Sequence, residues 1–150
     1  MDHHRSLRTG FPEVILAEGK TTEQVVAIAE RLAAQQDRLL ITRADADCYQ
    51  AVRERLPEAV YHTSARAVTL DRSGQRPRPG VAVLCAGTSD LPVAEEAAVT
   101  AELMGSEADR MYDVGVAGIH RLLDKMERIG TAKALVVVAG MEGALPSVVA

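Results

Sequence analysis

Aromatic residues are scarce in this sequence: among its 150 residues there is no tryptophan, and three tyrosines and one phenylalanine are the only aromatic side chains. Proteins that bind single-stranded nucleic acids stack bases on aromatic rings, and nucleic-acid binders are commonly basic. Here the formal net charge is −4. The composition therefore argues against a general nucleic-acid binder, and no nucleic-acid partner is expected.

Cysteine is equally scarce, with Cys48 and Cys85 as the only thiols. Neither belongs to a CxxC pair, so the spacing indicates neither a disulfide framework nor a zinc site. Long hydrophobic runs are missing as well: no stretch reaches the roughly 18 apolar residues of a membrane span, and the polar N-terminus has no signal-peptide h-region. We therefore expect a cytoplasmic protein with no membrane partner.

Hydrophobic residues nonetheless make up 47% of the chain, which is enough for a core. They occur in short runs that alternate with helical patterns, as in the α/β class with parallel strands. The length allows one ordinary domain or two small α/β lobes that share a sheet. Residues 71–79 (DRSGQRPRP) contain three arginines, two prolines and no apolar residue. We therefore predict an N-terminal α/β lobe at 1–70, a linker at 71–79 and a second domain at 80–150.

The N-terminal lobe is predicted to contain two helices among short strands. Thr21 or Thr22 caps the first helix, and Asp45 caps a second helix that runs to Leu56. Lys20 precedes the first helix as the lysine of a phosphate loop does, but no GxxxxGK motif surrounds it, so a complete phosphate loop is not predicted. The predicted extended segments are residues 13–17, 39–42, 59–62 and 65–70.

The stretch from Gly80 to Met104 combines a strand, a turn and a helix. Residues 81–85 form an apolar run, residues 86–90 (AGTSD) are small or polar, and Pro92 suits the first turn of a helix. Open α/β sheets bind ligands at the carboxyl ends of their strands. We therefore interpret the AGTSD turn as a ligand cradle. The alternative is an ordinary turn in which Ser89 or Asp90 only caps the helix.

Two later strand ends carry comparable turns. A short strand at 110–115 leads into a helix that should end near Gly130, and its first turn contains His120 and Arg121. An apolar strand at 134–139 leads into GMEG, in which two glycines flank a carboxylate. The ordinary alternatives are a structural histidine at a helix start and a solvent-exposed glutamate in a connection.

The three turns together form a specific set: AGTSD (residues 86–90), GIHR (residues 118–121) and AGMEGALP (residues 139–146). This set resembles the core shared by the aminoimidazole ribonucleotide carboxylase family, PurE, and its relative LarB of nickel-pincer nucleotide biosynthesis. RTGFPEVILAEGKT (residues 8–21) resembles LarB in particular, because PurE has no counterpart of GFPEV. The resemblance covers nearly the whole chain. It implies a flavodoxin-like parallel-sheet PurE-type domain from residue 80 that is incomplete at its C-terminus.

The resemblance implies a pyridinium-3,5-biscarboxylic acid mononucleotide synthase. Such an enzyme carboxylates nicotinic acid adenine dinucleotide at C5 of the pyridinium ring, with CO₂ as co-substrate, and hydrolyses the phosphoanhydride to release AMP. A homo-oligomer is also implied, since the family's relatives form octamers. Phosphoanhydride hydrolysis commonly needs Mg²⁺, for which Asp90 is a possible ligand. The alternatives are a PurE-type aminoimidazole ribonucleotide carboxylase or mutase and a non-catalytic nucleotide-binding module.

The resemblance also assigns roles to residues. Glu142 would accept the C5 proton, and His120 and Asp90 complete the expected catalytic set. The family's nucleophilic cysteine belongs to a later asparagine-serine-cysteine segment that these residues do not contain, so the chain alone is expected to be inactive. Cys85 does not replace it, because a thiol inside an apolar strand is usually inert. The expected substrate-binding residues are Gly87, Thr88, Ser89, Asp90, His120, Arg121, Gly140, Met141 and Gly143.

Overall fold

The computed structural model describes residues 12–140 and 143–149 and divides into two compact units, Met1–Gln75 and Arg76–Ala150. Each unit is built on its own sheet, so the two lobes do not share one as the sequence had allowed. Over the described ranges, no helix is both long enough and apolar enough to cross a membrane.

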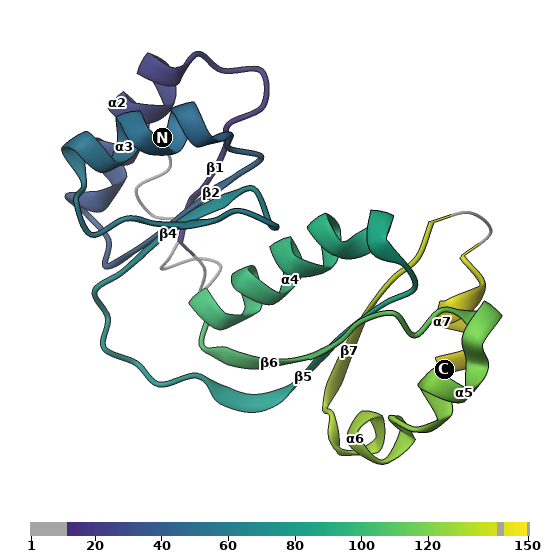
Figure 1. Ribbon diagram of the computed structural model, residues 1–150. Helices are drawn as coiled ribbons and strands as arrows, with labels where there is room; N and C mark the ends of the chain where they lie inside the picture. Colours follow the sequence, from purple (N-terminus) through teal and green to yellow (C-terminus); the bar gives the residue numbers. More distant parts are fainter. Residues whose placement is uncertain (1–11, 141–142, 150) are drawn as a thin grey trace. The chain divides into compact units, whose positions relative to one another are not determined.

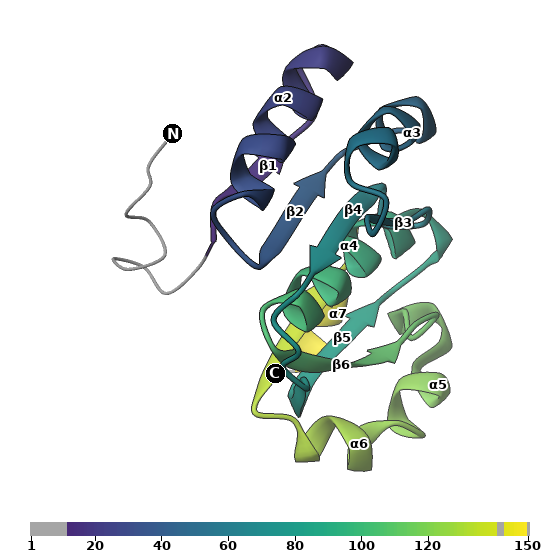
Figure 2. The ribbon, with the colours of Figure 1, turned by 90° about the vertical axis from the view of Figure 1, so that its left-hand side faces the viewer.

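The N-terminal unit contains a four-stranded sheet in the order β1-β2-β4-β3 (Figure 2). Strands β1 (Val14–Leu16) and β2 (Arg38–Thr42) are parallel. Strand β4 (Ala67–Asp71) runs antiparallel to both β2 and β3 (Val60–His62). The four predicted extended segments are therefore confirmed, and they form a small mixed sheet.

Two helices, α2 (Thr22–Ala33) and α3 (Ala46–Arg55), pack on one face of this sheet (Figure 1). Their predicted caps are confirmed: Thr21 Oγ1 accepts the amide three residues later at 3.3 Å, and Asp45 Oδ1 accepts the Cys48 amide at 2.8 Å. These bonds satisfy amides that the helix itself leaves without partners. Helices and sheet enclose one core, which includes Ile15, Val25, Ala29, Leu32, Leu39, Ile41, Val52, Val68 and Leu70.

The C-terminal unit contains a three-stranded sheet with β5 (Arg78–Cys85) between β6 (Ser106–Met111) and β7 (Ala134–Val138). Both pairs are parallel, which confirms the predicted α/β class with a parallel sheet. The linker predicted at 71–79 is shorter, because β4 reaches its first residue and β5 includes its last two. The three parallel strands bring the carboxyl ends to one edge of the sheet, where the three turns of interest begin.

Helices cover both faces of this sheet (Figure 1). They are α4 (Leu91–Leu103), α5 (Ile119–Leu123), α6 (Met126–Thr131) and α7 (Ala144–Val149). Successive residues of a strand point to opposite faces. Leu84 therefore packs with residues of α5, α6 and α7, whereas Cys85 packs with residues of α4. Both side chains are fully buried.

The strand predicted at 110–115 is wrong in its bounds. Strand β6 begins at Ser106 and ends at Met111, in register with β5. Four of its six residues are polar or charged. The prediction relied on apolar content, which is typical of buried parallel strands. It therefore placed this strand too late in the sequence, over the apolar residues that follow β6.

The single helix predicted to end near Gly130 is also wrong. The segment forms two short helices, α5 and α6, separated at Asp124 and Lys125. With this break, Leu122 and Ile129 both lie in the buried cluster on one face of the sheet. The predicted helix start is confirmed, since α5 begins one residue before His120.

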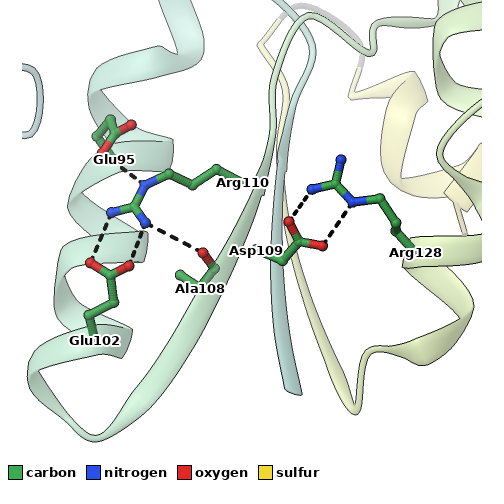
Figure 3. A network of polar contacts seen from close by, with 6 residues as sticks. All are labelled: Glu95, Glu102, Ala108, Asp109, Arg110 and Arg128. Atoms are coloured by element: carbon green, nitrogen blue, oxygen red, sulfur yellow. Dashed lines mark hydrogen bonds and ion pairs between the residues drawn. The ribbon is translucent and has the colours of Figure 1, made fainter. Parts of the chain in front are cut away.

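Consecutive charged residues of β6 connect the sheet to helices on both faces (Figure 3). The Arg110 guanidinium donates to both carboxylate oxygens of Glu102 on α4, one of them at 2.9 Å, and lies 3.4 Å from Glu95 Oε2. On the other face, the Asp109 carboxylate accepts two bonds from Arg128 of α6, one at 3.1 Å. Two adjacent residues thus hold helices on opposite sides of one edge strand.

Tyr112 follows β6 and packs beside Cys85 in the α4 cluster. Its hydroxyl is buried and has no hydrogen-bond partner among the residues that the structure describes. Burial raises the pKa of Tyr112 above its ordinary value of 10.0, and the Glu95 carboxylate raises it further, as an acceptor close to the hydroxyl and as a negative charge, although no hydrogen bond of normal geometry forms. The folded state therefore disfavours the phenolate. The resulting stabilisation is complete below the unfolded pKa of about 10 and is lost as the pH rises above it.

We expect the Tyr112→Phe variant to be about 0.5–1 kcal/mol more stable than the parent at pH 7, because it removes a buried hydroxyl without a partner. Between about pH 9.5 and 11 the parent should lose more stability than the variant, by up to about 1.4 kcal/mol per pH unit. Urea unfolding at both ends of this range measures the difference. If the parent and the variant lost equal unfolding free energy between these pH values, Tyr112 would not be the cause of the alkaline destabilisation.

Candidate functional site

A cavity of about 340 Å³ lies at the carboxyl edge of the parallel sheet. Gly87, Ser89 and Asp90 line it from the turn after β5, residues 115–117 line it from the turn after β6, and Gly140 lines it from the turn after β7. The start of α7 completes the wall. Three turns that are distant in sequence therefore surround one cavity, at the edge where open α/β sheets bind ligands.

The Asp90 side chain connects two of these turns. Its Oδ2 accepts the amide of Gly87 at 2.9 Å, and its Oδ1 accepts the amide of Gly140 at 3.0 Å. Asp90 makes no side-chain hydrogen bond to the amides of α4, so the alternative in which this carboxylate only caps the helix is wrong. The AGTSD turn is instead fastened to a turn 50 residues later in the sequence.

The turn after β6 approaches the AGTSD turn through backbone contact. The Gly115 amide donates to the Ala86 carbonyl at 3.2 Å, and a Cβ atom at Gly115 would lie 2.9 Å from that oxygen. Real Cβ atoms essentially never come so close. Glycine is therefore required at 115 by proximity, although its φ of −61° suits any residue. Together with Asp90, this contact holds all three turns around the cavity.

His120 and Arg121 lie in the first turn of α5, as predicted, but neither lines the cavity. The His120 side chain is exposed. Arg121 Nε donates to the Asp113 carbonyl at 2.6 Å, and its terminal nitrogen lies 3.3 Å from Asp113 Oδ1. The arginine therefore braces the turn that precedes it, and the structure does not bring these two residues together with Asp90.

The remaining predicted residues are placed in three different ways. Thr88 is exposed in the 3₁₀ turn Thr88–Asp90 and does not line the cavity. Gly143 has a left-handed φ of 64°, which favours glycine, and its amide donates to the Gly140 carbonyl at 2.9 Å. Met141 and Glu142 lie outside the described residues, so the role assigned to Glu142 stays a prediction.

Sequence reasoning missed Gly115, Val116, Ala117 and Leu145 as lining residues. The predictions followed polar side chains, whereas these positions contribute backbone, small groups and apolar surface. A glycine directly after the buried Val114, near the end of a strand, was the available signal for a close backbone approach.

Among the described lining residues, Asp90 is the only charged one. An anionic ligand would therefore depend on backbone amides and on the hydroxyl of Ser89. No group of three or more His, Cys, Asp or Glu side chains within the described ranges is placed to hold a metal. The expected Mg²⁺ stays a prediction, in which ligand phosphates would supply most of the oxygens.

Both cysteines are buried thiols. Burial raises the pKa of Cys85, which is fully buried in β5, and burial followed by the charge of Asp45 raises the pKa of Cys48. A thiol with a raised pKa stays protonated at neutral pH, and the protonated form is a poor nucleophile. Neither cysteine therefore has the properties of a catalytic nucleophile.

A larger cavity of about 520 Å³ lies near the amino ends of the same strands, where Gly80 and Lys133 line it. Its charged lining includes Asp109 and Arg128, which already pair with each other. Ligands of open parallel sheets bind at the opposite edge. We therefore assign the candidate site to the smaller cavity.

Residues 1–72 match the family described as the LarB/PurE-like N-terminal domain. The chain is also 39% identical, over 159 aligned positions, to the uncharacterized protein MJ0165 of Methanocaldococcus jannaschii. This match covers 100% of the chain and 62% of the relative, so the chain spans less than two thirds of that relative's length. Over residues 1–72, nearly the whole N-terminal unit, the chain therefore matches the LarB/PurE-like N-terminal domain.

Proposed function

We propose that the protein acts in the synthesis of pyridinium-3,5-biscarboxylic acid mononucleotide. The substrate is nicotinic acid adenine dinucleotide, which is carboxylated at C5 of its pyridinium ring and hydrolysed at its phosphoanhydride to release AMP. The observation that carries the proposal is the cavity at the carboxyl edge of the sheet, with its turns fastened by Asp90. The LarB/PurE-like family match supports it.

The cavity suits one nucleotide half of such a substrate. Its volume of about 340 Å³ falls at the lower end of the range for small-molecule sites, about 300–1,000 Å³. In the proposal, backbone amides of the AGTSD turn and the Ser89 hydroxyl bind the ribose and the phosphate. Asp90 acts as a positioning residue, because its carboxylate is committed to the amides of Gly87 and Gly140.

The proposed carboxylation begins with a thiolate from the family's asparagine-serine-cysteine segment. Its addition to the electrophilic pyridinium forms a carbon–sulfur bond and leaves a neutral enamine, whose C5 attacks CO₂ and forms the new carbon–carbon bond. Glu142 then takes the C5 proton as expulsion of the thiolate restores the aromatic ring. In a separate step, water attacks the phosphoanhydride and releases AMP.

The test is an assay of the complete gene product with nicotinic acid adenine dinucleotide, a CO₂ source and Mg²⁺. We expect AMP and the biscarboxylated mononucleotide in equal amounts, detected by mass spectrometry. Glu142→Gln should slow carboxylation about 100-fold or more, since general-base catalysis typically contributes that much. Glu127→Gln, which alters an exposed glutamate on α6, is the matched control and should retain activity.

Each other outcome of this assay has a definite meaning. Turnover of aminoimidazole ribonucleotide alone would replace the proposal by a PurE-type reaction. Dinucleotide binding without turnover of either substrate would indicate a non-catalytic nucleotide-binding module. Full activity in the Glu142→Gln variant would remove Glu142 from the mechanism.

A further inference from the structure

A second cavity, of about 230 Å³, lies within the N-terminal unit. It lies at the carboxyl ends of the parallel strands β1 and β2, where α2 and α3 begin, and it also contacts the turn before β4. It shares no lining residue with the cavity of the C-terminal unit. The proposed synthase reaction assigns it no role.

Three cationic side chains line this cavity: Lys20 after β1, Arg43 after β2 and Arg66 before β4. Two carboxylates, Glu18 and Asp45, also line it, so positive charge is in excess by one. The Asp45 carboxylate is engaged as the cap of α3, and Glu18 is exposed. A local positive excess in a chain of net charge −4 is expected to attract anions.

The backbone at two of these cations is unusual. Arg43 and Arg66 have φ angles of 56° and 48°, and they are two of the three non-glycine residues with positive φ in the described part of the chain. This conformation is strained for an ordinary residue, and glycine avoids the strain. The Ala44 amide donates to the Arg66 carbonyl at 2.8 Å and holds the two segments together. Arginine at both strained positions indicates a use for the side chains.

Three of the residues that line the cavity are buried and uncharged. Val25, Cys48 and Ala17 are buried, with exposed fractions of 1%, 5% and 8%. Burial raises the pKa of Cys48, so the thiol carries no charge at pH 7. The volume lies below the usual range of about 300–1,000 Å³ for drug-sized ligands. A compact anion therefore fits better than a whole nucleoside.

We propose that this cavity binds the phosphate or pyrophosphate group of an anionic ligand, with Lys20, Arg43 and Arg66 as its cationic contacts. Guanidinium groups bind phosphate oxygens through paired, charge-assisted hydrogen bonds. Lys20 Nζ donates to the Leu16 carbonyl at 2.8 Å, which leaves an ammonium group two further N–H donors for a ligand. The site is additional to the nucleotide site of the C-terminal unit and does not rest on the proposed reaction.

The test titrates the 150-residue chain with sodium pyrophosphate at pH 7 and low salt, by calorimetry and by amide NMR. We expect saturable binding that shifts the amides of residues 17–22, 43–48 and 66. Lys20→Ala, Arg43→Gly and Arg66→Gly should each weaken binding about tenfold or more, since each removes a charge-assisted contact to the anion. Glu18→Gln should strengthen binding about twofold, because it removes a repelling charge.

The matched control is Arg31→Gln, which removes one positive charge from the last turn of α2 and should change affinity less than about twofold. The two arginine-to-glycine variants should melt no more than about 2 °C below the parent, since glycine relieves the left-handed strain. If either arginine variant fails to fold, the Lys20→Ala variant provides the test, because Lys20 is exposed and its replacement should leave the fold intact. No saturable binding, shifts confined to residues 86–90, or an equal loss in Arg31→Gln would each overturn the proposal.

Discussion

Replacing Asp90 by alanine is expected to weaken dinucleotide binding at least about tenfold and to lower the free energy of unfolding by about 2 kcal/mol. The carboxylate accepts amides from Gly87 and Gly140, and no neighbouring group in the described turns duplicates both bonds. Without it, the turn after β7 loses its attachment to the AGTSD turn. A ligand must then order both turns itself, which reduces affinity.

The series for this prediction is Asp90→Ala, Asp90→Asn and Asp124→Ala, compared by calorimetry with the dinucleotide and by urea unfolding. Asparagine retains one acceptor oxygen, so its losses should be about half those of alanine. Asp124 is exposed just after α5 and controls for the removal of one negative charge. Equal effects at Asp124 and Asp90 would show that charge matters and the connection between turns does not.

Replacing Gly115 by alanine is expected to destabilise the protein by about 1–3 kcal/mol, as overpacking usually does. The new Cβ would lie 2.9 Å from the Ala86 carbonyl oxygen, and a backbone atom in a clamped turn cannot move aside easily. The displaced turn should also narrow the cavity, so dinucleotide affinity should fall about tenfold. This result would establish that contact between the first two turns shapes the site.

The matched control for Gly115→Ala is Gly130→Ala. Gly130 lies in α6, and a Cβ there would meet no atom within 4 Å. Because alanine favours helix, this variant should gain about 0.5–1 kcal/mol. Urea unfolding of the two variants should therefore give changes of opposite sign. A loss in both would mean that the Gly115 result reflects a general intolerance of added methyl groups in the unit.

Local sequence signals predicted local structure well. Thr21 and Asp45 were recognised as helix caps because a cap depends on an amide three residues away. The AGTSD turn was placed correctly because an apolar run, small polar residues and a helical pattern follow one another directly along the chain. Strand β6 was misplaced because its polar residues are explained by partners such as Glu102 and Arg128, which only the folded chain brings to it.

The composition of the site was harder to predict. His120 was expected to contact the ligand because it lies in the first turn of a helix after a strand. Whether such a residue lines the cavity depends on the conformation of the turn that precedes the helix. That turn is braced by the bond from Arg121 to Asp113, whose left-handed φ of 58° no local pattern indicated. The cationic cavity could not be predicted for the same reason, because no local pattern indicates the left-handed conformations of Arg43 and Arg66. The sequence indicated only Lys20, as the lysine of an incomplete phosphate loop.

The separate sheets of the two units have a consequence for cooperativity. Each sheet has its own buried clusters, and a chain with more than one compact unit need not unfold in a single cooperative step, so one midpoint need not describe both units. Tyrosine is distributed to resolve them: Tyr49 and Tyr61 stack with ring centres 5.0 Å apart in the first unit, and Tyr112 belongs to the second. Because the chain has no tryptophan, the tyrosine signal reports on both units, and comparing the Tyr112→Phe variant with the parent isolates the contribution of the second unit.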